Sequence, residues 1–208
     1  APSPEGAETT TANLRSRRDQ LQWLMSYYLD ETNNFMIRAH APTAMGRLMQ
    51  GVEDQELRKM VATQLIEDLS KHSKKQDEIQ QSCALALGQI GDCDEDPLDV
   101  QIRETLMTVL EDLANQQTRN FSLIALGQVS GRPGAGAGDP IAGVTTSDRK
   151  ANVRRYLQNQ LAQGKRAVQT WSALAIAIME RSLDDAQQTS SSEMKDALRV
   201  VLADAKSP

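Results

Sequence analysis

Residues 79–92 read Ile-Gln-Gln-Ser-Cys-Ala-Leu-Ala-Leu-Gly-Gln-Ile-Gly-Asp, and a shorter form of this pattern occurs three more times in the chain. A small residue stands at its centre each time, and the four centres lie 42, 39 and 50 residues apart: Gly46, Gly88, Gly127 and Ala177. A recurrence of about 40 residues is typical of a stacked unit of two helices. Glycine inside a helix costs about 0.5–1 kcal/mol relative to alanine. We therefore expect these glycines to allow a close approach between neighbouring helices, and we expect alanine there to be nearly neutral.

Between these stretches, apolar residues recur at helical spacing over 53–70, 98–114 and 147–163, and each segment is predicted to be a partner helix. Terminal helices are expected from Asn13 and over 193–205, where they would cap the two ends of the stack. Pro42 falls inside a predicted helix that begins at Phe35, and it should kink or split that helix.

The chain is expected to form one domain over residues 12–208. Residues 1–11 contain no apolar residue larger than Ala or Pro and are predicted to be a disordered leader. Residues 131–147 begin with a Gly-rich run and are predicted to be an insertion between the third and fourth repeats. The insertion lacks the Gly-Lys-Ser/Thr end of a phosphate-binding loop, so we expect it to bind no nucleotide.

Composition narrows the class of protein. Aromatic residues make up only 3% of the 208, so the core is expected to consist of aliphatic side chains in closely packed helices. The formal net charge of −5 argues against the whole chain being a nucleic-acid binder. The longest apolar run, 173–179, is far shorter than the roughly 20 residues of a membrane span, and none is expected.

The residues that carry metal and catalytic chemistry are scattered. Asp92, Asp94 and Asp96 alternate like the first ligands of a calcium loop, but Pro97 replaces the required Gly and Arg103 replaces the bidentate Glu. We therefore expect these aspartates to cap the next helix and otherwise to be solvated, with weak, unspecific calcium binding as the alternative. The metal-binding and nucleophilic side chains have no useful spacing, so we expect no metal, no cofactor, no small-molecule substrate and no catalysis: Cys83, Cys93, His40 and His72. Two cysteines are also too few to indicate a compartment.

The repeated wording resembles the HEAT-like repeats of the phycobilisome-lyase type, whose first helix runs Val-Arg-x-x-Ala-x-x-Ala-Leu-Gly-x-Ile-Gly-Asp. Residues 79–92 match this pattern nearly throughout, and Ile37-Arg38 and Val168-Gln169 begin two other copies in register. The third copy departs from it at Thr118, and the fourth lacks its Gly. The resemblance implies an all-α fold, namely a right-handed α–α superhelix (HEAT-like solenoid) of about four helical-pair repeats with terminal capping helices. It covers roughly residues 33–205 and implies little about function.

Charge is distributed unevenly along the predicted repeats. Residues 53–112 hold 15 acidic and 6 basic residues, and residues 113–166 hold 2 acidic and 8 basic residues. The basic group is Arg119, Arg132, Arg149, Lys150, Arg154, Arg155, Lys165 and Arg166. This asymmetry is either solvated surface or a bipolar face that orients a protein partner.

In the family that the chain resembles, the helix after each Gly helix lines the concave surface. Turning the apolar stripe of each such helix inward leaves six residues facing out, which are our predicted contact residues: Lys59, Thr63, Glu104, Glu111, Arg155 and Asn159. We expect a non-catalytic protein–protein interaction module or scaffold. A lyase-like enzyme subunit related to the bilin lyases and nucleic-acid binding through the basic C-terminal third are the alternatives.

Overall fold

The computed structural model describes residues 16–52, 54–70, 72–134 and 145–204, which form helices joined by turns with no strand among them. The all-α prediction is confirmed. The helices are α2 (Arg17–Leu29), α3 (Phe35–Arg38), α4 (Ala41–Met49), α5 (Gln55–Leu69), α6 (Asp77–Ile90), α7 (Pro97–Asp112), α8 (Gln116–Gly131), α9 (Thr146–Gln163), α10 (Arg166–Asp185) and α11 (Ser192–Asp204). Across these four described ranges, no helix has the length and apolar character needed to cross a membrane.

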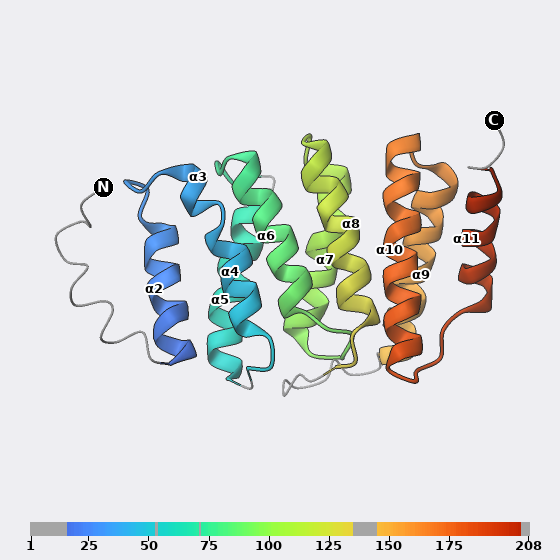
Figure 1. Ribbon diagram of the computed structural model, residues 1–208, viewed down its shortest axis with the longest axis horizontal. Coiled ribbons are helices and arrows are strands. Elements are labelled where there is room, and N and C mark those ends of the chain that lie inside the picture. The colour runs from blue at the N-terminus through green and yellow to red at the C-terminus, as the bar shows by residue number, and fades with distance from the viewer. Residues whose placement is uncertain (1–15, 53, 71, 135–144, 205–208) are drawn as a thin grey trace.

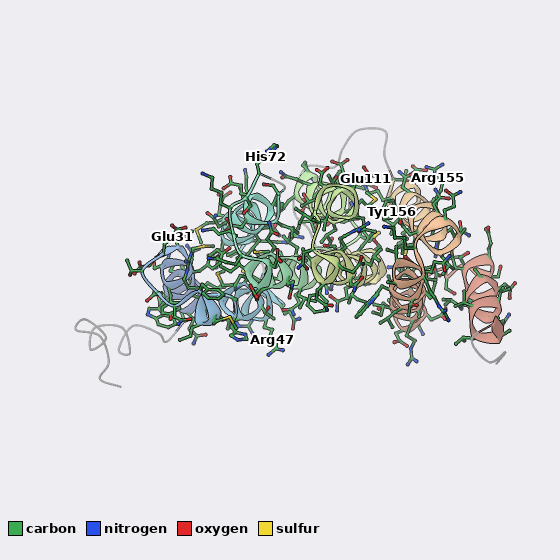
Figure 2. All side chains as sticks on the ribbon, turned by 90° about the horizontal axis from the view of Figure 1, so that it is seen from above. Glu31, Arg47, His72, Glu111, Arg155 and Tyr156 are labelled. Atoms are coloured by element: carbon green, nitrogen blue, oxygen red, sulfur yellow. The ribbon has the colours of Figure 1, made fainter. Side chains whose placement is uncertain are left out.

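The helices form two rows, which Figure 1 shows from one side and Figure 2 from above. Helices α4, α6, α8 and α10 pack side by side in the first row. Helices α5, α7 and α9 lie behind them, and each packs mainly on the helix that follows it in sequence. Helices α2 and α11 pack on α4 and α10 at the two ends.

The repeated glycines lie where helices of the first row meet. A Cβ added at Gly46 would lie 3.0 Å from the Cα of Ala86, and one added at Gly88 would lie 2.8 Å from the Cα of Ala125. Gly127 faces Ala175 on α10 in the same way, at 3.1 Å from its Cα. The close approach predicted from the recurrence is thus confirmed for all three glycines.

Capping residues and prolines set several helix boundaries. Ser16 and Asp19 form a capping box at the start of α2. Pro42 separates the short α3 from α4 and stands in the first turn of α4, as expected for a residue that has no backbone N–H to donate. The predicted insertion at 131–147 is shorter at both ends, because Gly131 is the last residue of α8 and Thr146 the first of α9. Residues 135–144 and the predicted leader at 1–11 lie outside the described residues.

Aliphatic side chains from both rows form one continuous core, which includes Leu65, Leu87, Leu106, Leu126 and Leu157. Met60 stands one position before the buried Val61 on α5, but its own side chain is 43% exposed. Cys83 and Cys93 are both buried free thiols.

Candidate interaction surface

Helices α5, α7 and α9 carry all six predicted contact residues. Residues four or seven positions apart share one helix face, so each pair points the same way from its helix. Five of the six side chains are exposed and Thr63 is half-buried. Figure 2 shows Glu111 and Arg155 on the α5, α7 and α9 side of the molecule and Arg47 on the opposite side.

A groove of about 260 Å³ lies between the second half of α5 and α7 on this side. Its apolar lining comes from Ile66, Leu69, Val109 and Leu113. Its polar lining comes from Ser70, His72, Gln101, Glu104, Thr105, Thr108 and Asp112. We call this feature the α5–α7 groove. It combines an apolar lining with exposed carboxylates at Glu104 and Asp112, an arrangement that accommodates an apolar side chain beside a positive charge.

The groove collects only one of the six predicted residues, Glu104. Glu111 lies instead near Tyr156, where burial, and to a smaller extent the negative charge of Glu111, raises the pKa of the tyrosine. The Tyr156 hydroxyl donates to the backbone oxygen of Met107 at 2.9 Å and joins α9 to α7. The groove lining also excludes the other four predicted contact residues, Lys59, Thr63, Arg155 and Asn159.

The apolar part of the groove was not predicted, because Leu69, Val109 and Leu113 recur at helical spacing and such apolar stripes normally face the core. Leu69 and Val109 are indeed buried, while Ile66 and Leu113 are half-buried at the margin of their stripes. A half-exposed aliphatic residue at the edge of a helix's apolar stripe can indicate a groove. It does so only when the edges of two such stripes are known to face each other.

The basic group in residues 113–166 is divided by the fold. Arg149 is buried and donates to the backbone oxygen of Glu95 at 3.2 Å, and Lys150 donates to the Gln188 side chain. Arg154 holds the buried carboxylate of Glu180 at 2.8 Å. Three further cations of the group are exposed: Arg155, Lys165 and Arg166. Half of these six residues therefore hold helices together, which reduces the basic surface expected from the sequence.

The acidic turn after α6 is enclosed by arginines from four parts of the chain. Arg132, just after α8, donates to the backbone oxygens of Gly88 and Gln89 at 3.0 Å each. Arg103 of α7 donates to the backbone oxygens of Asp92 and Asp94. Arg58 of α5 and Arg149 of α9 reach the same turn at Ile90 and Glu95. These cations satisfy carbonyl groups at and beyond the end of α6 that have no helical partner.

The carboxylates of this turn are also engaged within the fold. Asp96 accepts from the backbone N–H groups of Leu98 at 2.7 Å and Asp99 at 3.1 Å, which confirms the predicted capping of the next helix. Arg58 pairs with Asp96 at 3.0 Å and also with Asp99. The carboxylates of Asp92, Asp94 and Asp99 come within 4.8 Å of one another, but the Arg58 guanidinium already offsets their charge. We therefore interpret this cluster as a structural feature that stabilises the fold.

Asp99 is the most strongly perturbed carboxyl of the cluster. Burial, followed by the negative charge of Asp92, raises its pKa to about 8, and the opposing effect of Arg58 does not compensate. Its Oδ1 accepts from the backbone N–H of Asp92 at 2.8 Å, while its buried Oδ2 has no hydrogen-bond partner among the described residues.

Comparison with protein-family models, with curated proteins and with solved structures found no match to this chain.

Proposed function

We propose that this protein is a non-catalytic protein-interaction module in which repeated helix pairs form a right-handed HEAT-like superhelix. The glycine contacts between successive helices of the first row support the repeat interpretation, because they recur at equivalent positions. The face of α5, α7 and α9 is the proposed binding surface.

The α5–α7 groove is the observation that carries this proposal. Binding sites in proteins combine apolar lining with a few placed polar groups, and the groove has both. Its exposed carboxylates favour a partner that places an apolar side chain in the groove next to a lysine or arginine.

Two further observations support binding over the alternatives. Burial raises the pKa of the Cys83 thiol to about 12 and also raises that of Cys93, so neither cysteine offers an accessible thiolate for a lyase-like reaction. Arg149, Lys150 and Arg154 are bonded within the fold. Fewer cations therefore remain for phosphate groups than the sequence indicates.

The test compares two threonine substitutions of the same type. Thr108 lines the groove and Thr170 lies on α10 in the first row; both are exposed, and each hydroxyl donates to the backbone oxygen four residues earlier. The arginine of Thr108→Arg should fill part of the groove, and its positive charge should repel the lysine or arginine of the partner. Thr170→Arg adds the same side chain away from the groove. With a partner purified from the native host, we expect Thr108→Arg to raise the Kd at least about tenfold, or about 1.4 kcal/mol. An unchanged Kd for Thr108→Arg, or equal losses in both variants, would exclude the groove.

A further inference from the structure

A second hollow continues from the α5–α7 groove at the end of α5. It measures about 690 Å³ and shares Ser70 and His72 with the groove. It lies where the turn between α2 and α3 meets the turn between α5 and α6, and Figure 1 shows both turns at the same end of the helix rows. We call it the Arg38 pocket, after the most buried cation in its lining.

Arg38 is 4% exposed, yet its guanidinium has no carboxylate partner among the described residues. Its Nε donates to the backbone oxygen of Tyr28 at 2.8 Å, and its Cζ lies 6.0 Å from the centre of the Tyr28 ring. Its Nη2 is buried without any hydrogen-bond partner in the described ranges. Arginine keeps its charge at every accessible pH, and a buried charge is costly unless it is paired. The guanidinium thus lies in the lining of the pocket with one N–H donor group unmatched.

Lys75 brings a second cation to the same tyrosine ring, with its Nζ 5.9 Å from the ring centre. Its side chain is 18% exposed, and its Nζ donates to Glu31 at 3.1 Å. Glu31 is 76% exposed in its side chain, and the hydrogen bond from Lys75 followed by the charges of Lys75 and Arg38 lowers its pKa. An exposed surface carboxylate thus already interacts with the charges of both cations.

The remaining acidic groups around the pocket leave these cations available. Asp68 is buried and accepts from the Tyr28 hydroxyl at 2.6 Å and from Gln64 at 3.0 Å, so its carboxylate is bound within the core. Glu67 is exposed at the rim, and the exposed side chains of His72 and Lys74 stand there as well.

We infer that the Arg38 pocket binds a carboxylate of the protein partner, with Arg38 and Lys75 as its ligands and Glu31 as the internal carboxylate that it displaces. This inference rests on the proposed function, because the same partner segment would place its apolar side chain in the adjoining α5–α7 groove. A carboxylate fits better than other anions because the side chain that now contacts Lys75 is itself a carboxylate. Guanidinium and carboxylate groups also match each other as paired donors and acceptors.

The test on the isolated protein uses acetate as the probe at constant ionic strength. Binding is followed through the ¹H–¹⁵N signal of the Arg38 side-chain Nε–H group. We expect a saturable shift, a Kd lowered severalfold by Glu31→Gln, and a Kd raised at least about fivefold by Lys75→Gln. Arg47→Gln removes the same charge from an exposed side chain on the opposite side of the molecule and should leave the Kd unchanged. No saturable shift, an unchanged Kd in Lys75→Gln, or tighter binding of inorganic phosphate than of acetate would overturn the assignment.

The purified partner separates this inference from the function on which it rests. Lys75→Gln should weaken the partner and Glu31→Gln should strengthen it, while Thr108→Arg should weaken the partner without changing the Kd for acetate. Partner binding that responds to Thr108→Arg but not to Lys75→Gln or Glu31→Gln would contradict the pocket alone. The reverse pattern would contradict the groove alone.

Discussion

Gly88 on α6 packs directly against Ala125 on α8, and a Cβ added at Gly88 would lie 2.8 Å from both the Cα and the Cβ of Ala125. This distance is shorter than the van der Waals contact of two carbon atoms. The Cα of Ala125 belongs to the backbone of α8 and cannot move aside as a flexible side chain could. The sequence alone indicated that alanine would be nearly neutral at these glycines, because Ala177 occupies the equivalent position in the last copy. Ala177 is half-buried whereas Gly46, Gly88 and Gly127 are buried, so it does not represent the other three positions.

We therefore expect Gly88→Ala to lower the free energy of unfolding by about 1–3 kcal/mol, and Gly88→Leu to lower it further. The sign is informative because a Gly-to-Ala change inside an unconstrained helix stabilises it by about 0.5–1 kcal/mol. Urea denaturation of both variants measures the effect. Equal or greater stability of Gly88→Ala would show that α6 and α8 can separate without cost.

Asp99 should make the stability depend on pH. Its pKa in the folded state is about 8, above the ordinary value of 3.8, so the folded protein holds this proton more tightly than the unfolded chain does. The contribution of Asp99 to stability is therefore fully present below about pH 4 and is lost as the pH rises to about 8.

Asp99→Asn keeps an oxygen acceptor for Arg58 and for the backbone N–H of Asp92 but cannot ionise. We expect the free energy of unfolding of the variant, relative to the natural protein, to increase from pH 4 to pH 8. Chemical denaturation across this range measures it, and Asp185→Asn at an exposed pair with Arg181 serves as the control. Parallel profiles for Asp99→Asn and the natural protein would mean that Asp99 is ionised throughout.

Arg154 and Arg155 are neighbours in sequence, but charge reversal is expected to lower stability much more at Arg154 than at Arg155. Arg154 donates to both carboxylate oxygens of Glu180, at 2.8 and 3.1 Å, and to the backbone oxygen of Thr189. Loss of one partner from a buried pair costs about 3–5 kcal/mol, and the 20% exposure of the Arg154 side chain places it at the lower end. Arg155→Glu should change stability by less than about 0.5 kcal/mol, since the side chain is exposed.

Thermal or urea unfolding of the two single variants at equal net charge decides the point. A similar loss in both would mean that the Glu180 pair contributes little. Arg154 would then behave like an exposed surface residue, as the sequence alone indicated.

Much of the helical arrangement could be predicted from the repeated sequence pattern, because each feature of that pattern depends on a single residue. Helix contacts are marked by Gly46, Gly88 and Gly127. A glycine inside a helix lowers its stability, and close packing against a neighbouring helix offsets that loss. Pro42 marks the division between α3 and α4 through its missing N–H. These features depend on one residue type at one position and can be recognised without knowing the neighbouring helix.

The site could not be predicted to the same extent because its features depend on pairs of distant segments. Arg58 stands beside Leu57 in the sequence like any surface arginine, yet it pairs with Asp96 and Asp99 at the start of α7 and is buried there. Similarly, nothing local distinguishes Arg154 from Arg155, because only the position of Glu180 on α10 does so. The groove requires the relative placement of α5 and α7, and the sequence supplied one of its residues, Glu104.

We propose that a protein partner binds in the α5–α7 groove. The most direct measurement is site-specific photo-cross-linking with a benzophenone side chain at Thr105, which is half-buried in the groove, and with the same group at Thr170 on the other row. We expect a purified partner to cross-link from position 105, Thr108→Arg to abolish this product, and position 170 to give none. Cross-linking from position 170 but not from position 105 would contradict it.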